Sequence, residues 1–257
     1  MKILIYFNVF LQNVVLIGLF PLVLLQAMWV KKKTLRLPEP EGKREFGHLT
    51  AHERGLSVLV IGDSAAAGVG AKTQENALSG LLHSQLTANQ NVKLSVNATT
   101  GFTSCDIVSV LTQLPPQHYE VVLISMGVND VTKFTSLTRW KRNINEIVSL
   151  LTTKFSSKLI IFTALPPMHL FPALPHPLRA LLGLRARLLN KLLKGCVDKL
   201  PHTTHLAIPI MENDVSVASM QQSGFMANDG FHPSSKGYAL WAQQVAILTE
   251  KYLKNTE

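Results

Sequence analysis

The stretch LSVLVIGDS at residues 56–64 decides the fold of this chain. Ser57 is the only polar residue among its first six, so the stretch lacks the polar alternation of a half-exposed strand. Such a run is typical of a strand that is covered on both faces, and Gly62 marks its end. Asp63 and Ser64 follow at the carboxyl end of the strand, where open parallel sheets bind their ligands. The stretch therefore predicts a central strand and, directly after it, a ligand-binding loop.

Similar apolar runs recur along the chain and alternate with longer amphipathic segments. The other predicted strands are residues 92–96, 121–125, 159–163 and, more weakly, 204–207. The predicted helices are residues 75–88, 105–114, 137–154, 178–200 and 234–253. Alternating strands and helices indicate a parallel sheet with helices on both faces. The pattern therefore predicts an α/β domain built as a three-layer αβα sandwich.

Length and charge narrow the classes of protein that fit this chain. With 257 residues, 47% of them hydrophobic, it suits one globular domain with an appendage. The formal net charge of +9 suits attraction to nucleic acid or to an anionic surface. The sequence has no zinc-finger spacing, RNA-binding signature or long Lys/Arg block, so we expect no nucleic-acid partner. It leaves the oligomeric state open.

The N-terminal segment, residues 1–30, is the most apolar part of the chain. Between Ile3 and Val30 it contains no Asp, Glu, Lys, Arg or His. A helix needs about 20 apolar residues to cross a bilayer, so this segment predicts a single membrane anchor. A cleaved secretory signal is the alternative, although the run exceeds the usual length of about 7–15 apolar residues. The lysines at 31–33 favour a cytoplasmic face for the rest of the chain, with a periplasmic or secreted domain as the alternative.

Residues 31–54 connect this segment to the predicted domain. They are rich in charge and contain Pro38 and Pro40, which is typical of a tether. We therefore expect three parts: an anchor or signal over 1–30, a tether over 31–54 and a globular domain over 55–257.

Three short motifs follow the first three predicted strands. Ser64 follows the first strand, and a serine hydroxyl becomes a good nucleophile when a neighbouring base takes its proton. Gly101 follows the second strand and can bring a backbone N–H close to a ligand. Asn129 follows the third strand and can aim an amide donor at developing negative charge. Taken singly, each has an ordinary alternative, which is a turn for Ser64 and Gly101 and a helix cap for Asn129.

A fourth motif, Asp229-Gly230-Phe231-His232-Pro233, precedes the last predicted helix. Pro233 suits the first helical position and pushes His232 toward an extended conformation. Asp229 can then accept a hydrogen bond from Nδ1 of the imidazole while Nε2 points outward. That is how a carboxylate orients the base of a Ser–His–Asp triad. A histidine that only begins a helix is the alternative.

Together the four motifs resemble the GDSL, or SGNH, hydrolase family, whose signature residues are a serine, a glycine, an asparagine and a histidine. The matching positions are Ser64, Gly101, Asn129 and the pair Asp229 and His232. The resemblance implies that Ser64, His232 and Asp229 are catalytic. It also implies an oxyanion hole made by Ser64, Gly101 and Asn129, a flavodoxin-like sheet of five parallel strands in the order 2-1-3-4-5, and chemistry without a metal or cofactor.

The activity that this resemblance implies is a serine-dependent carboxylic ester hydrolase that acts through an acyl-enzyme. Its substrate would be a small-molecule or lipid ester, as in an esterase, lysophospholipase or lipase. A carbohydrate O-acetylesterase or acetyltransferase is the alternative within enzymes, and a membrane-tethered binding module with a decayed site is the alternative outside them. Two residues depart from the family pattern: Ala65 stands where leucine is expected, and Phe102 follows Gly101 where small or polar residues are common.

Residues 166–187 are apolar and proline-rich and then arginine-rich. Because they follow the fourth predicted strand, they are placed to line or cover the substrate cleft, as a wall for an acyl chain or as a membrane-facing flap. An ordinary loop followed by a packed helix is the alternative.

Overall fold

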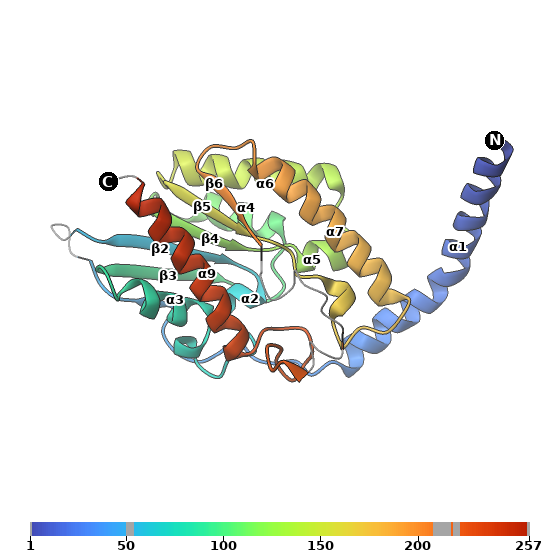
Figure 1. Ribbon diagram of the computed structural model, residues 1–257, viewed down its shortest axis with the longest axis horizontal. Coiled ribbons are helices and arrows are strands. Elements are labelled where there is room, and N and C mark those ends of the chain that lie inside the picture. Colours follow the sequence, from blue (N-terminus) through green and yellow to red (C-terminus); the bar gives the residue numbers. More distant parts are fainter. Residues whose placement is uncertain (1, 50–53, 208–216, 218–221, 256–257) are drawn as a thin grey trace.

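The computed structural model describes residues 2–49, 54–207, 217 and 222–255, with side chains from Gly18 onward. The chain forms a mixed six-stranded sheet with helices on both faces (Figure 1). The strands are β1 (Glu45–Phe46), β2 (Leu56–Gly62), β3 (Val92–Ala98), β4 (Val121–Ser125), β5 (Leu159–Thr163) and β6 (Thr203–Leu206). The α/β class predicted from the sequence is confirmed.

The strands are arranged in the order β1-β3-β2-β4-β5-β6. The prediction of five parallel strands in the order 2-1-3-4-5 is therefore wrong, because β1 pairs antiparallel with β3 and makes the sheet mixed. The difference lies at this edge, since β2 to β6 all run parallel to their neighbours. Strand β1 comes from the predicted tether, where Glu45 pairs with Ser95 and Phe46 with Leu94. Two residues are too few to show a strand period in the sequence.

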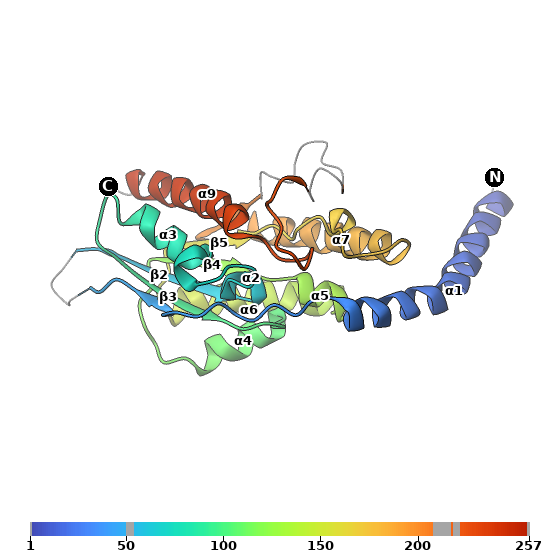
Figure 2. The ribbon, with the colours of Figure 1, turned by 90° about the horizontal axis from the view of Figure 1, so that it is seen from below.

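The helices divide between the two faces of the sheet. They are α1 (Lys2–Lys33), α2 (Ser64–Ala67), α3 (Leu78–Leu86), α4 (Ser104–Gln113), α5 (Val128–Thr132), α6 (Leu137–Thr153), α7 (Leu178–Val197) and α9 (Ser235–Lys254), with 3-10 turns η1 (Gln74–Asn76) and η2 (Met168–Leu170). Helices α3 and α9 lie on one face, and α4 and α6 lie on the other (Figure 2). Helix α7 packs with α6.

Alternate residues of the central strands point to opposite faces and so build two cores. On β4, Ile124 packs into the core with α4, α6 and α7, whereas Leu123 packs into the core with α3 and α9. Trp140 of α6 is fully buried and donates its indole N–H to the Leu189 carbonyl of α7 at 3.1 Å. Because both faces are covered, the strands carry continuous apolar runs.

Helix α1 extends beyond the rest of the chain, and its last turns lie against the domain (Figures 1 and 2). Val30 is only 9% exposed and belongs to the core that contains α6 and α7. Among the described residues, no helix is both long and apolar enough to span a membrane. The predicted membrane anchor over residues 1–30, and with it the membrane localisation, is therefore wrong. The side chains of residues 1–17 lie outside the described residues, and in the part of α1 whose side chains are described Val30 packs into the domain core.

Candidate active site

Ser64 occupies the first position of α2, directly after β2. Gly62 lets the end of β2 approach β4 closely, because a Cβ at this position would lie 2.0 Å from the Ser125 carbonyl oxygen. Asp63 caps the helix, since its Oδ1 accepts a hydrogen bond from Ala65 N at 3.1 Å. Asp63 N also donates to Ser125 O at 3.0 Å. The turn that presents Ser64 is therefore fixed to both α2 and β4.

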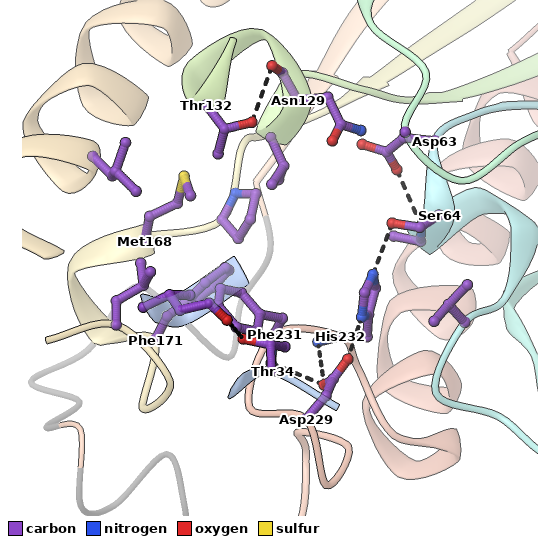
Figure 3. Close-up of a pocket in the computed structure, with 18 of the residues that line it drawn as sticks. Thr34, Asp63, Ser64, Asn129, Thr132, Met168, Phe171, Asp229, Phe231 and His232 are labelled. Carbon is purple, nitrogen blue, oxygen red and sulfur yellow. Dashed lines mark hydrogen bonds and ion pairs between the residues drawn. The ribbon is translucent and has the colours of Figure 1, made fainter. Parts of the chain in front are cut away.

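A chain of hydrogen bonds joins Ser64 to the turn before α9. The distance from Ser64 Oγ to His232 Nε2 is 2.8 Å, and that from His232 Nδ1 to Asp229 Oδ2 is 2.5 Å (Figure 3). An ionised carboxylate can only accept, so Nδ1 carries the hydrogen of the second bond and Nε2 can accept the Ser64 proton. The structure thus brings the three predicted residues together.

Hydrogen bonds hold Asp229 in its ionised form. Oδ1 accepts from the backbone N–H groups of Phe231 at 2.9 Å and His232 at 3.0 Å. Burial alone would raise the pKa of Asp229, but these bonds and the His232 ring outweigh burial and lower that pKa. At neutral pH the carboxylate is charged and can stabilise a protonated imidazole.

Asp63 is a second buried carboxylate next to the serine, and it is only 3% exposed. Loss of solvent raises its pKa from 3.8 to about 6, against the opposing effects of the Ala65 N–H, His232 and the Ser125 hydroxyl. The Ser125 hydroxyl donates to Asp63 Oδ1 at 3.4 Å. These hydrogen bonds hold the turn around Ser64, so Asp63 helps to position the serine.

Gly101 and Asn129 line the same cavity as Ser64. Gly101 has a φ of +91°, which favours glycine, in the turn after β3. Among the described residues, no group accepts a hydrogen bond from the N–H of Gly101 or of Ser64. Asn129 Nδ2 donates to the Phe102 carbonyl at 2.9 Å, and its amide carries a second hydrogen. Three hydrogen-bond donors therefore belong to residues that line the same cavity as Ser64.

Buried polar contacts hold the start of α5, which carries Asn129. Asp130 is fully buried and accepts hydrogen bonds from Ser104 N at 2.9 Å and from Ser104 Oγ at 2.7 Å. Burial raises the pKa of Asp130 more than these hydrogen bonds lower it. This contact ties α5 to α4 and so fixes the position of Asn129.

The loop that carries Gly101 is held by residues that the sequence did not reveal. Glu39 Oε1 accepts hydrogen bonds from both the N–H and the hydroxyl of Thr100, each at 2.7 Å. Arg44 forms an ion pair with Glu39 and donates to the Ala98 carbonyl at 2.6 Å. Glu39 and Arg44 lie in the predicted tether, where nothing in the local pattern indicates a contact with this loop.

The site opens into a cavity of about 1220 Å³. Most of its lining is apolar, and Ser64 and His232 face Met168 and Phe171 across it (Figure 3). Phe171 packs edge-on against Phe231 with ring centroids 5.8 Å apart. The stretch 166–187 therefore lines the cavity, as the acyl-wall hypothesis required. Within the described part of the chain, no three His, Cys, Asp or Glu residues form a cluster that could hold a metal ion.

Comparisons with known proteins identify the family of this chain. Residues 60–240 match the family model described as the GDSL-like lipase/acylhydrolase family. The psychrotrophic esterase EstA from Pseudoalteromonas sp. has a similar structure, with 20% identity, a TM-score of 0.55, and coverage of 77% of this chain and 98% of that one. The lipase/acylhydrolase from Enterococcus faecalis has 19% identity, a TM-score of 0.52 and coverage of 77% and 96%.

Est24, a carbohydrate acetylesterase from Sinorhizobium meliloti, is also similar, with 16% identity, a TM-score of 0.52 and coverage of 77% and 99%. At such identities these likenesses show the fold alone. A comparison with curated proteins finds no match. The family match spans most of the chain and includes every motif residue, which confirms the resemblance found in the sequence. The chain therefore belongs to the GDSL-like lipase/acylhydrolase family and is a hydrolase of ester bonds.

Proposed function

We propose that this chain is a serine esterase that cleaves carboxylic esters with long apolar acyl groups through an acyl-enzyme. One observation carries the proposal. The hydrogen-bonded chain from Asp229 through His232 to Ser64 ends at a large cavity with mainly apolar walls. The chain of hydrogen bonds supplies an activated nucleophile, and the cavity supplies the place for its substrate.

In the first step, Ser64 Oγ attacks the ester carbonyl carbon while its proton moves to His232 Nε2. Asp229 keeps the ring in the required tautomer and stabilises the imidazolium. The carbonyl oxygen becomes an oxyanion, which accepts hydrogen bonds from the N–H groups of Ser64 and Gly101 and from Asn129 Nδ2. Each of these donors is worth about 10²–10³ in kcat in comparable sites.

The intermediate then collapses, and the bond between the carbonyl carbon and the alcohol oxygen breaks. His232 gives its proton to the departing alcohol, which leaves the acyl group on Ser64. A water molecule attacks this acyl group while His232 takes its proton, and the proton then returns to Ser64 Oγ. The net reaction consumes one ester and one water and releases a carboxylic acid and an alcohol.

The size and polarity of the cavity favour a long acyl chain over an acetyl group. Its volume of about 1220 Å³ exceeds the range of about 300–1,000 Å³ that is usual for ligand pockets. An acetyl group would leave most of this apolar surface in contact with water. An esterase, lysophospholipase or lipase therefore fits the cavity better than a carbohydrate O-acetylesterase or acetyltransferase.

The test is hydrolysis of p-nitrophenyl esters from acetate to dodecanoate by the full chain. We expect kcat/KM to rise with acyl length, and Ser64→Ala to abolish turnover and labelling by a fluorophosphonate. Ser84→Ala, which removes an exposed hydroxyl on α3, serves as the matched control and should keep both. Turnover confined to acetate would favour the acetylesterase alternative. A folded wild-type protein that neither reacts with the fluorophosphonate nor hydrolyses any ester would support a decayed binding module.

A further inference from the structure

One wall of the cavity comes from a part of the chain that lies far in sequence from every catalytic motif. Six residues of α1 line it: Phe20, Val23, Leu24, Ala27, Val30 and Lys31. They lie three or four positions apart, so they share one face of the helix. Residues 34–39, which follow α1, line the same cavity. Some of the apolar side chains of α1 therefore line the substrate site.

Gln26 fixes α1 to the start of α7. Its Nε2 donates to the His176 carbonyl at 2.5 Å, and its Oε1 accepts from Leu178 N at 3.1 Å. Leu178 is the first residue of α7, where backbone N–H groups have no acceptor within the helix. Both ends of one side-chain amide are thus used to hold the two helices together, and α7 also supplies residues to the cavity wall.

The other end of the segment is fixed at the catalytic loop. Glu39 binds Thr100, the neighbour of Gly101, through two hydrogen bonds of 2.7 Å. Between Gln26 and Glu39, Val30 is only 9% exposed within the core formed with α6 and α7. The segment from Gln26 to Glu39 is therefore held at three points along the cavity.

From these contacts we infer that the cavity-facing side chains of residues 20–39 form an acyl-binding wall, in addition to the one that residues 166–187 supply, and set the longest acyl chain that the enzyme accepts. This inference rests on the proposed esterase function. The hydrocarbon part of an acyl chain has no hydrogen-bonding groups, so it binds by removing apolar surface from water, and each buried methylene strengthens binding about fourfold. The face from Phe20 to Lys31 is about 16 Å long, at about 1.5 Å per residue, which suits a long chain.

The test replaces a small residue of this face with a large one. Ala27→Trp fills the cavity beside α1, so it should lower the ratio of kcat/KM for p-nitrophenyl dodecanoate to that for the butyrate by about tenfold or more. Met28→Trp is the matched control, because Met28 neighbours Ala27, is 60% exposed and does not line the cavity. That variant should leave the ratio within about twofold of wild type.

A second variant removes apolar surface without adding bulk. Leu24 is 50% exposed, so Leu24→Ala leaves the core intact while it shortens the wall. It should raise KM for the dodecanoate several-fold more than KM for the butyrate. Circular dichroism of each variant checks that the fold is kept.

The outcomes separate the two proposals. If wild type hydrolyses both esters but neither Ala27→Trp nor Leu24→Ala changes the ratio by more than about twofold, the acyl wall is refuted and the esterase remains. An equal loss in Met28→Trp also refutes the wall. A wild type restricted to short esters contradicts both the wall and the proposed preference for long acyl groups. If wild type hydrolyses no ester and takes up no fluorophosphonate, the proposed function itself fails.

Discussion

Replacing Asp63 with asparagine should make the protein more stable above pH 6. Asp63 is only 3% exposed, and its Oδ1 accepts hydrogen bonds from Ala65 N and the Ser125 hydroxyl. An asparagine oxygen can accept the same two bonds in a side chain of nearly the same shape. The substitution therefore removes the charge and keeps the cap of α2.

The sign of the effect follows from the direction of the pKa shift. In the folded chain the pKa of Asp63 is raised from 3.8 to about 6, so between these pH values the folded state holds a proton that the unfolded chain has lost. The free energy of unfolding then falls as pH rises through this window. At about 1.4 kcal/mol for each tenfold change in proton affinity, the loss is about 3 kcal/mol once pH exceeds 6. Asparagine cannot ionise, so the variant escapes this loss.

Urea denaturation followed by tryptophan fluorescence at pH 4, 5, 6 and 7.5 measures the difference. Wild type and Asp63→Asn should unfold at similar urea concentrations at pH 4. At pH 7.5 the variant should unfold at a concentration about 1–3 M higher, given the usual slope of stability against urea. A difference that stays constant from pH 4 to 7.5, or a wild type that is the more stable at pH 7.5, would refute the reasoning.

Asp229→Asn provides a comparison of opposite sign. The pKa of Asp229 is lowered, so its carboxylate contributes stability above the unfolded pKa and loses it as pH falls. We expect this variant to be less stable than wild type at neutral pH, with the deficit vanishing in acid. Two substitutions of the same chemical kind should therefore give pH dependences of opposite slope.

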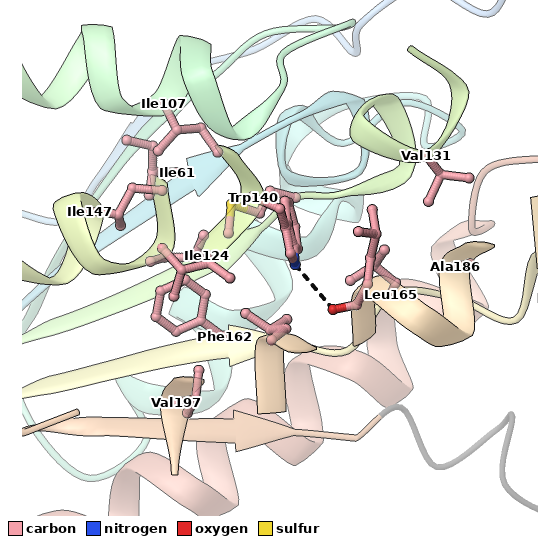
Figure 4. Packing of buried hydrophobic residues seen from close by; sticks show 14 of the residues in the cluster. Ile61, Ile107, Ile124, Val131, Trp140, Ile147, Phe162, Leu165, Ala186 and Val197 are labelled. Carbon is pink, nitrogen blue, oxygen red and sulfur yellow. Dashed lines mark hydrogen bonds between the residues drawn. The ribbon is translucent and has the colours of Figure 1, made fainter. Parts of the chain in front are cut away.

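Three further predictions test the oxyanion donor, its support and the core. Asn129→Ala should lower kcat about 10²–10³-fold with little change in KM, and an unchanged kcat would remove Asn129 from the oxyanion hole. Glu39→Ala should lower kcat about tenfold by loosening the loop before Gly101, whereas KM for a short ester should stay within about twofold. Trp140→Ala should lower the free energy of unfolding by about 3–5 kcal/mol, because the indole is fully buried between α6 and α7 (Figure 4). A loss below about 1 kcal/mol would contradict that packing.

The elements that the sequence predicts best are those covered on both faces. The apolar runs at 121–125 and 159–163 coincide with β4 and β5, and the amphipathic stretch 137–154 ends one residue beyond α6. The stretch 75–88 is less regular, because residues 74–76 form a 3-10 turn before α3 begins at Leu78. Strand β1 has only two residues, and its pairing with β3 depends on the fold around it. Local pattern therefore predicts the parallel strands, including β6 at one edge, but not β1 at the other edge.

The N-terminal segment shows what hydropathy alone cannot distinguish. An apolar run has the same mean hydropathy whether it meets lipid, a protein core or a substrate cavity. In the described part of α1, Val30 enters the core and Ala27 lines the cavity, while Lys31 ends the run. The prediction of an anchor treated all sides of the helix as equivalent, whereas in the described part of α1 one face lines the cavity.

Some site residues are positioned by their neighbours in the sequence, and others are positioned by residues far away in the sequence. Ser64 is oriented by Asp63 next to it, and His232 is oriented by Asp229 three positions earlier, so a short motif contains both the group and its support. Such motifs can be recognised in a single sequence. By contrast, Glu39 and Thr100 are 61 positions apart, and Gln26 and His176 are 150 apart.

These separations in sequence reflect what each part of the site must do. Proton transfer between Ser64 and His232 requires atoms placed to within about 0.5 Å. These two residues are 168 positions apart, so a tight turn orients each side chain and the fold brings the two turns together. Selection of an acyl chain requires only volume and apolar surface, which the face of any adjacent helix can supply. Ester chemistry can therefore stay the same while the α1 wall changes. Substitutions on the cavity face of α1 should accordingly change the preferred acyl length without moving the hydrogen bond between Ser64 and His232.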